Sequence, residues 1–148
     1  MGFFEDNEYI CIIFELMHTN LRCLLSKENL REDILSEFNV CKMFAKMVRA
    51  TAVCHESNII HRDIKLENFL VKSCPDSQEL DIKLSDFGIA CQFSEIDPPS
   101  AKKGSLASVA PEVLTEDKYD FKVDSWSLGV ILYELLTTVH PFHSNEMS

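Results

Sequence analysis

Glycine is scarce in this chain of 148 residues, which contains only Gly2, Gly88, Gly104 and Gly129. Because these four positions lie far apart, the sequence contains no G-x-G-x-x-G loop, the glycine-rich turn whose backbone approaches bound phosphates closely. Any phosphate-binding glycine loop is therefore excluded from these residues.

Positive charge and long apolar runs are also lacking. Against 24 Asp and Glu stand 14 Lys and Arg, which gives a formal net charge of −10. Such a balance does not favour nucleic acid or an anionic membrane, so we expect neither as a partner. The longest apolar runs, at 9–14 and 126–139, are shorter than the about 20 residues of a membrane-spanning helix.

Cysteine is present six times, yet no pair is spaced as C-x-x-C and no histidine pair has zinc-finger spacing. Without a recognisable signal peptide, we expect reduced thiols in an intracellular protein rather than a disulfide framework. We expect the cytoplasm as its location, with the nucleus as the alternative.

Apolar periodicity predicts two long helices and several short strands. A stripe at three- and four-residue steps predicts the first helix, and it consists of Phe38, Cys41, Phe44, Ala45, Val48 and Ala52. The predicted elements are a buried strand at 9–14, a short helix at 16–25, long helices at about 37–55 and 123–138, strands at 69–71 and 82–84 joined by a polar loop at 73–80, and a loop at 92–108. The fold class is therefore mainly α with short β hairpins (α+β).

The stretch HRDIKLENFL, residues 61–70, concentrates chemically useful side chains. Asp63 can accept a proton from an attacking hydroxyl group. Lys65 lies two positions further on and would point to the same side of an extended loop, where an ammonium group can neutralise a phosphoryl group. Asn68 offers a neutral oxygen, a suitable ligand for magnesium.

A second carboxylate, Asp86, follows a predicted strand in the stretch SDFG, residues 85–88. Gly88 would allow the chain to turn directly after it. Asn68 and Asp86, at the ends of separate strands, could hold a magnesium ion between them. A metal, a base and a positive clamp are the parts of a phosphoryl-transfer site.

Three ordered motifs resemble the eukaryotic serine/threonine protein kinase family. HRDIKLEN resembles its catalytic loop, SDFG its metal-binding motif and residues 110–112 its A-P-E motif. The lysine after the HRD aspartate favours serine/threonine over tyrosine kinases. The stretch 111–136 is similar to calcium/calmodulin-dependent and calcium-dependent kinases, whereas the hinge FELMHTNL is more similar to cyclin-dependent kinases, so the subfamily stays open.

The resemblance implies a kinase-like fold in which residues 1–148 form a partial kinase domain. We expect the C-terminal lobe with its hinge, and we expect the N-terminal lobe and the last helices to be absent. The roles it implies are Asp63 as base, Lys65 on the transferred phosphate, Asn68 and Asp86 on magnesium, and Phe14, Glu15, Met17, Asn20 and Leu70 around the nucleotide.

Regulatory and structural roles follow from the same resemblance. Arg62 beside the base suggests control by phosphorylation of the loop at 92–105, since an arginine can pair with a phosphate. The regulatory residues implied are Arg62, Phe87 and Gly88, with Ser94, Ser100 and Ser105 as candidate phosphorylation sites. The structural residues implied are His61 packed under Phe87, Glu112, and Asp124 as a brace for the catalytic loop.

The sequence also departs from the family pattern. No V-A-I-K strand precedes the hinge, so the lysine that anchors ATP and its partner glutamate are missing. Leu66 replaces the usual proline, Ser105 the usual threonine and Ser108 the usual tyrosine. Glu67 fits two interpretations, a reader of a basic substrate side chain or a solvated loop charge.

The predicted function is transfer of the ATP γ-phosphate to serine or threonine hydroxyls of a protein substrate, with magnesium. One alternative is a catalytically inactive kinase fragment or pseudokinase that binds a regulatory protein or a separate N-terminal lobe. A second alternative is a small-molecule phosphotransferase with a kinase-like fold, against which the A-P-E motif argues.

Overall fold

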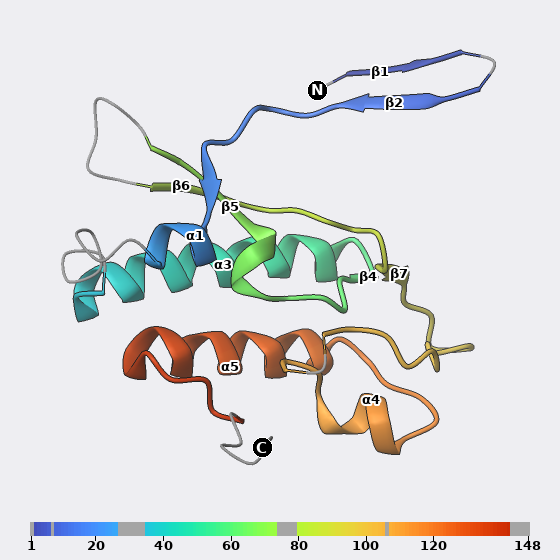
Figure 1. The fold of residues 1–148 in the computed structure, drawn as a ribbon. Helices are drawn as coiled ribbons and strands as arrows, with labels where there is room; N and C mark the ends of the chain where they lie inside the picture. The colour runs from blue at the N-terminus through green and yellow to red at the C-terminus, as the bar shows by residue number, and fades with distance from the viewer. Residues whose placement is uncertain (1, 7, 27–34, 74–79, 106, 143–148) are drawn as a thin grey trace, which may run out of the picture.

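A computed structural model describes residues 2–6, 8–26, 35–73, 80–105 and 107–142 (Figure 1). Its elements, in order, are β1 (Gly2–Glu5), β2 (Ile10–Ile13), β3 (Thr19–Asn20), α1 (Leu21–Leu25), α3 (Glu37–Glu56), β4 (Ile59–Ile60), a 3-10 turn (Leu66–Asn68), β5 (Phe69–Ser73), β6 (Leu80–Leu84), β7 (Cys91–Gln92), α4 (Pro111–Thr115) and α5 (Lys122–Thr137). The predicted class of mainly α structure with short β hairpins is confirmed.

Helix α3 begins where Ser36 accepts a hydrogen bond from the Asn39 N–H at 3.4 Å, which caps the first turn. The helix itself was predicted within two residues, but the predicted apolar face was wrong. The buried face consists of Val40, Met43, Met47, Thr51 and Cys54. Phe38 and Val48 of the predicted stripe are exposed, whereas Phe44 is partly buried against the core.

The β5–β6 hairpin lies beside α3, and the register of its strands turns one apolar face inward. Phe69 pairs with Leu84 and Val71 pairs with Ile82 across the antiparallel ladder. Phe69, Val71 and Ile82 are buried, as alternation along a strand requires when one face meets a core. The loop predicted at 73–80 lies largely outside the described residues, which stop at Ser73 and resume at Leu80.

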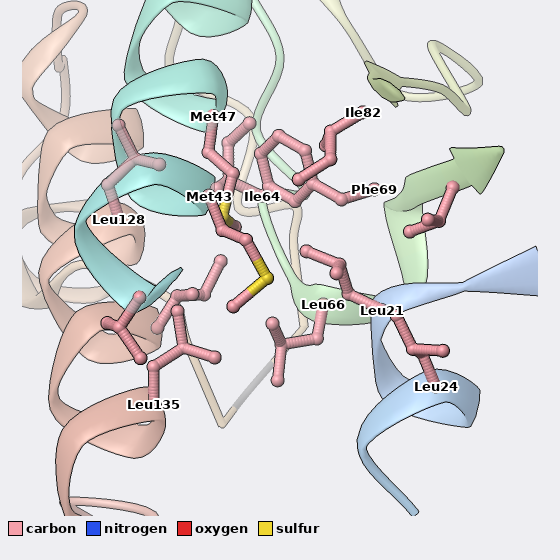
Figure 2. Packing of buried hydrophobic residues seen from close by; sticks show 13 residues of the cluster. Leu21, Leu24, Met43, Met47, Ile64, Leu66, Phe69, Ile82, Leu128 and Leu135 are labelled. Atoms are coloured by element: carbon pink, nitrogen blue, oxygen red, sulfur yellow. The ribbon is translucent and has the colours of Figure 1, made fainter. Parts of the chain in front are cut away.

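The main core joins α1, α3, β5, β6 and α5 (Figure 2). Met43 and Met47 reach from α3 toward Leu128 and Leu135 of α5 on one side and Phe69 on the other. Leu21 and Leu24 close the core from the short helix α1, and Ile64 and Leu66 enter it from the catalytic-loop stretch. The loop that carries the candidate site is therefore anchored in the core by its own apolar residues.

The hairpin β1–β2 stands away from the rest of the structure (Figure 1). The prediction of a buried strand at 9–14 was correct for the strand and wrong for the burial. Ile10 is 69% exposed and Phe14 is 70% exposed. Nothing in the described residues packs against this hairpin, so its apolar side chains face solvent here.

Three smaller expectations can be compared with the structure. The short helix predicted at 16–25 is confined to α1 (Leu21–Leu25), after the two-residue strand β3. Cys11, Cys23, Cys41, Cys54 and Cys91 are all free thiols, and Cys74 lies outside the described residues. Among the helices that the structure describes, none is long and apolar enough to cross a membrane.

Phe69→Ala should destabilise the chain, because this side chain of β5 is fully buried in the core that it shares with α3. We expect a loss of about 3–5 kcal/mol in the free energy of unfolding, the usual cost of such a cavity. Phe3→Ala is the matched control, since Phe3 is 75% exposed, and should change this value by less than about 0.5 kcal/mol. Urea unfolding followed by circular dichroism measures both, and equal losses would contradict the described core.

Candidate active site

The catalytic-loop stretch is held in place by the carboxylate of Asp124, at the start of α5. Its Oδ2 accepts a hydrogen bond from the His61 backbone N–H and its Oδ1 from that of Arg62, both at 2.9 Å. The side chain is buried, and His55 of α3 contacts the same Oδ2 through Nε2 at 2.9 Å. A buried carboxylate with such partners fixes the backbone directly before Asp63.

His61 connects the catalytic loop to the SDFG stretch. Its Nδ1 accepts a hydrogen bond from the Asp63 N–H at 3.3 Å, and its Nε2 lies 3.0 Å from the Ser85 carbonyl oxygen. An imidazole with one accepting and one donating nitrogen satisfies both contacts. The ring is fully buried and meets Phe87 edge to face at 4.9 Å, so the predicted packing under Phe87 is present.

Asn68 connects the same two stretches through both its backbone and its side chain. Its carbonyl oxygen accepts hydrogen bonds from the Ser85 N–H and Oγ, each at 2.9 Å. Its Nδ2 donates to the backbone oxygen of Asp63 at 2.8 Å and to Asp63 Oδ2 at 3.0 Å. The amide is thereby oriented, and its Oδ1 is left as an acceptor.

Asp63 lies at the centre of a group of polar side chains. Lys65 Nζ is 2.7 Å from Asp63 Oδ2, and Ser105 Oγ donates to Asp63 Oδ1 at 2.7 Å. Lys65 Nζ also donates to Ser105 Oγ at 3.1 Å, which closes a triangle of three residues. Lys65 therefore points to the same side as Asp63, as the sequence spacing predicted.

The carboxyl group of Asp63 is held ionised by these neighbours. Burial acts to raise its pKa, but the hydrogen bonds from Lys65, Ser105 and Asn68 outweigh burial and place the pKa below its ordinary value. At neutral pH the group is therefore an acceptor for a hydroxyl proton, and a cation lies directly beside it.

Backbone strain gathers at this site. Arg62 and Asp86 adopt positive φ angles of 68° and 63°, a conformation that non-glycine residues rarely hold and that clusters at functional sites. The predicted turn at Gly88 is present, because the Ala90 N–H donates to the Phe87 carbonyl at 3.1 Å, and the positive φ before it lies on Asp86. Gly104 does require glycine, because its φ is 126° and an added Cβ would lie 2.8 Å from the Arg62 carbonyl oxygen.

The Arg62 side chain turns away from Asp63 and joins the following loop. Its Nε donates to the Ile89 carbonyl at 2.6 Å, and its Nη1 contacts the Tyr119 hydroxyl at 3.1 Å. The Tyr119 hydroxyl donates in turn to the Ala101 carbonyl at 2.7 Å. The guanidinium thus already links three segments around the region 92–105 where phosphorylation was predicted.

The predicted regulatory serines differ in their surroundings. Ser94 and Ser100 are exposed in the loop, where a modifying enzyme can reach them. Ser105 is half-buried and engaged with Asp63 and Lys65. Glu112 is half-buried in the first turn of the short helix α4 and lines a hollow with Tyr119 and Lys122.

The residues predicted around a nucleotide lie along the hinge and on β5. Glu15 forms ion pairs with Lys72 at 2.6 Å and with Lys83, and these cations lower the pKa of Glu15 to about 2. Asn20 pairs with Leu70 across β3 and β5. The Asn20 side chain caps α1, because its Oδ1 accepts from the Cys23 N–H at 2.8 Å.

Phe14 and Met17 occupy the hinge itself. Phe14 is exposed and Met17 half-buried, and a backbone hydrogen bond from His18 N–H to the Val71 carbonyl at 3.0 Å holds the segment beside β5. Their predicted role at an adenine ring stays a prediction.

The donor set fits magnesium. Asp86 is exposed, and its Oδ1 accepts a hydrogen bond from the Gly88 N–H at 3.2 Å. Among the described residues no hydrogen-bond donor contacts Asn68 Oδ1, and Ser85, which precedes Asp86, bonds to the Asn68 carbonyl. Hard oxygen donors from one carboxylate and one amide suit magnesium, which completes its shell with water and phosphate oxygens. Within the described residues, no group of three or more His, Cys, Asp or Glu side chains could hold a metal alone.

Sequence reasoning missed several contacts at the site. It did not predict three sets of contacts: Ser85 with Asn68, Tyr119 with Arg62, and Arg22 with Glu67 and Glu134. Their partners lie 17, 57, 45 and 112 positions away along the chain, and no local pattern carries such information.

Comparison with known proteins identifies the class. The family description "Protein kinase domain" matches residues 1–148, and the chain therefore belongs to the protein kinase family. The chain is 41% identical over 112 residues to the serine/threonine-protein kinase PEPKR2 of Arabidopsis thaliana, which covers 76% of this chain and 23% of that protein.

Two further relatives support the same class. Calcium-dependent protein kinase 22 of Arabidopsis thaliana is 36% identical over 148 residues, covering 97% of this chain and 28% of that kinase. CBL-interacting protein kinase 12 of Oryza sativa is 39% identical over 127 residues, covering 83% of this chain and 22% of that kinase. The chain thus spans about a quarter of the length of these relatives. The predicted resemblance to serine/threonine kinases, calcium-dependent ones included, is confirmed, and the likeness of the hinge to cyclin-dependent kinases stays a prediction.

Asp124→Ala should destabilise the chain, because it leaves the buried His61 and Arg62 N–H groups without an acceptor. We expect a loss of about 2–4 kcal/mol in the free energy of unfolding. Asp117→Ala is the matched control, since Asp117 is exposed and precedes α5, and should cost less than about 0.5 kcal/mol. Thermal and urea unfolding measure the difference, and an unchanged Asp124→Ala protein would refute the bracing role.

The ionised state of Asp63 predicts a pH dependence. Because the pKa is lowered in the folded chain, its contribution to stability is present above about pH 4 and is lost as the pH falls below that value. The difference in unfolding free energy between the wild type and Asp63→Asn should therefore change between about pH 6 and about pH 3, with the wild type losing stability relative to the variant. A relative gain for the wild type on acidification would contradict the geometry, and Asp117→Asn should show little change.

Proposed function

We propose that this chain carries the phosphoryl-acceptor side and the metal-binding residues of a serine/threonine protein kinase. The observation that carries the proposal is the group around Asp63: an ionised carboxylate, an ammonium 2.7 Å away and an oriented amide. Family membership supports it, and so does the connection of this group to Asp86 through Asn68 and Ser85.

The proposed reaction moves the γ-phosphoryl group of ATP to a serine or threonine hydroxyl of a protein. The hydroxyl oxygen forms a bond to the γ-phosphorus, the bond from that phosphorus to the β–γ bridging oxygen breaks, and ADP leaves. Asp63 orients the hydroxyl and accepts its proton. Lys65 neutralises charge on the transferring group, and positioning and charge stabilisation supply most of the catalysis.

Asn68 and Asp86 are the residues that would hold magnesium. When bound, the ion neutralises the charge of the β- and γ-phosphate oxygens. Phe14, Glu15, Met17, Asn20 and Leu70 would contact the nucleotide from the hinge and β5. The C-terminal lobe is the part of the kinase fold to which we assign residues 1–148, and we propose an intracellular location for it.

An inactive kinase fragment that acts by protein binding is the second candidate function. The exposed apolar hairpin β1–β2 and the lack of a glycine-rich loop within these residues favour it. In this case Asp63 and its partners would be intact but would have no fully built nucleotide site beside them.

Phosphoryl transfer by the longest natural protein that contains this chain tests the proposal. With radiolabelled ATP, magnesium and a library of serine, threonine or tyrosine peptides, we expect label on serine and threonine. Asp63→Asn should lower the rate at least about 100-fold, as loss of a general base does, and the exposed Asp117→Asn should leave it unchanged. Transfer to tyrosine, or full activity of Asp63→Asn, would refute the assignment.

The 148-residue chain by itself provides the second measurement. Because it has no glycine-rich loop and no anchoring lysine, we expect weak nucleotide binding and negligible transfer by the chain alone. Transfer by this chain that Asp63→Asn abolishes would contradict that expectation, and would show that these residues build a sufficient nucleotide site.

A further inference from the structure

Arg22 of α1 joins two carboxylates that lie far from it in the sequence. Its Nε donates to Glu67 Oε1 at 2.9 Å, its Nη2 donates to Glu134 Oε2 at 3.1 Å, and its Nη1 contacts the other oxygen of Glu134. One guanidinium thus satisfies an acidic residue of the catalytic loop and one of α5 together. The planar fork of arginine matches such carboxylates better than any other side chain.

This acidic pair faces the candidate active site. Arg22, Glu67 and Glu134 line a hollow of about 310 Å³ together with Lys65 and Ser105. Lys65 and Ser105 are the two residues that contact the Asp63 carboxylate. Whatever approaches Asp63 from this side therefore also meets Glu67, Glu134 and the arginine between them.

The carboxylates of Glu67 and Glu134 together can bind a cationic group, and the Arg22 guanidinium occupies this position. The Glu134 side chain is only 16% exposed, and a carboxylate at such depth needs a charged partner. The pKa of Arg22 lies above its ordinary value, chiefly because the side chain donates hydrogen bonds to Glu134 and also because it donates one to Glu67. The guanidinium is therefore charged, and its hydrogen bonds place it between the two carboxylates.

We propose that Arg22 determines substrate specificity by occupying the Glu67–Glu134 pair in place of a basic side chain of the substrate. This inference rests on the proposed function, because it assumes that a peptide lies beside Asp63. Glu67 is then neither a reader of a basic substrate side chain nor a solvated loop charge. Its carboxylate binds a basic group, and that group is Arg22 of the same chain. The hollow beside it then accepts a neutral side chain, since Ala107, Val130 and Ile131 supply its apolar wall.

Peptide binding tests this without phosphoryl transfer. The probes are two pools of fluorescent peptides with one serine, in which a single arginine, or its neutral isostere citrulline, is placed in turn at each of the neighbouring positions. The 148-residue wild type should bind both pools alike. Arg22→Ala should bind the arginine pool about fivefold more tightly than the citrulline pool, the value of one partly exposed ion pair.

Two control variants test whether the gained preference comes from the Glu67–Glu134 pair that Arg22 leaves unoccupied or from the loss of one positive charge. Arg22→Ala with Glu67→Gln should lose the gained preference, and Arg49→Ala, which removes an exposed arginine on α3, should not gain one. Arg22→Gln keeps most of the side chain and should show the same gain if Arg22→Ala fails to fold, as circular dichroism would reveal.

Three outcomes would overturn the inference. These are a wild-type preference for arginine, an equal affinity of both pools for the folded Arg22 variants, or no binding of either pool to any variant. Failure of the proposed function looks different: the natural protein would transfer no phosphate, while the arginine preference gained by Arg22→Ala would stand.

Discussion

The geometry of the whole site depends on one buried carboxylate. Asp124, at the first turn of α5, accepts the backbone N–H groups of His61 and Arg62. Those two residues precede Asp63, and Arg62 is held there at a positive φ of 68°. A strained backbone persists only when its surroundings outweigh the strain, and the two hydrogen bonds to a charged acceptor provide this. The core then fixes α5 itself, through Leu128, Ile131 and Leu135.

Beyond Asp124, the site is held together by hydrogen bonds to backbone carbonyl groups as well as by contacts between side chains. His61 reaches the Ser85 carbonyl, and Ser85 in turn reaches the Asn68 carbonyl. The catalytic loop and the SDFG stretch are therefore joined twice, at both ends of the segment that carries Asp63 and Lys65. The short ladder of β4 with β7 adds a third tie, because Ile60 pairs with Cys91. Asp63 and Asp86 therefore belong to one hydrogen-bonded framework, although 23 positions separate them.

The sequence allowed the main helices, the central hairpin and the central polar group to be predicted, because each has a local signal. Alternation and turn residues mark β5 and β6, and the spacing from Asp63 to Lys65 fixes their common side. The face of α3 could not be predicted, since Phe38 and Met43 are both apolar and only the position of α5 decides which is buried. The burial of β2 failed for the same reason: apolar composition indicates a strand that can be buried, and its neighbours determine whether it is.

The contacts of Ser105 show why the candidate site is more than a collection of suitable residues. Its hydroxyl donates to Asp63 Oδ1 at 2.7 Å while Lys65 approaches the same hydroxyl at 3.1 Å. A serine hydroxyl therefore already lies between Asp63, the proposed base, and the cation Lys65. A substrate hydroxyl would need the same two partners, and a carboxylate has lone pairs for both, since ionised Asp accepts at about four positions. Because Lys65 and Asn68 take Oδ2, the rest of Oδ1 is the place where a second hydroxyl can be received.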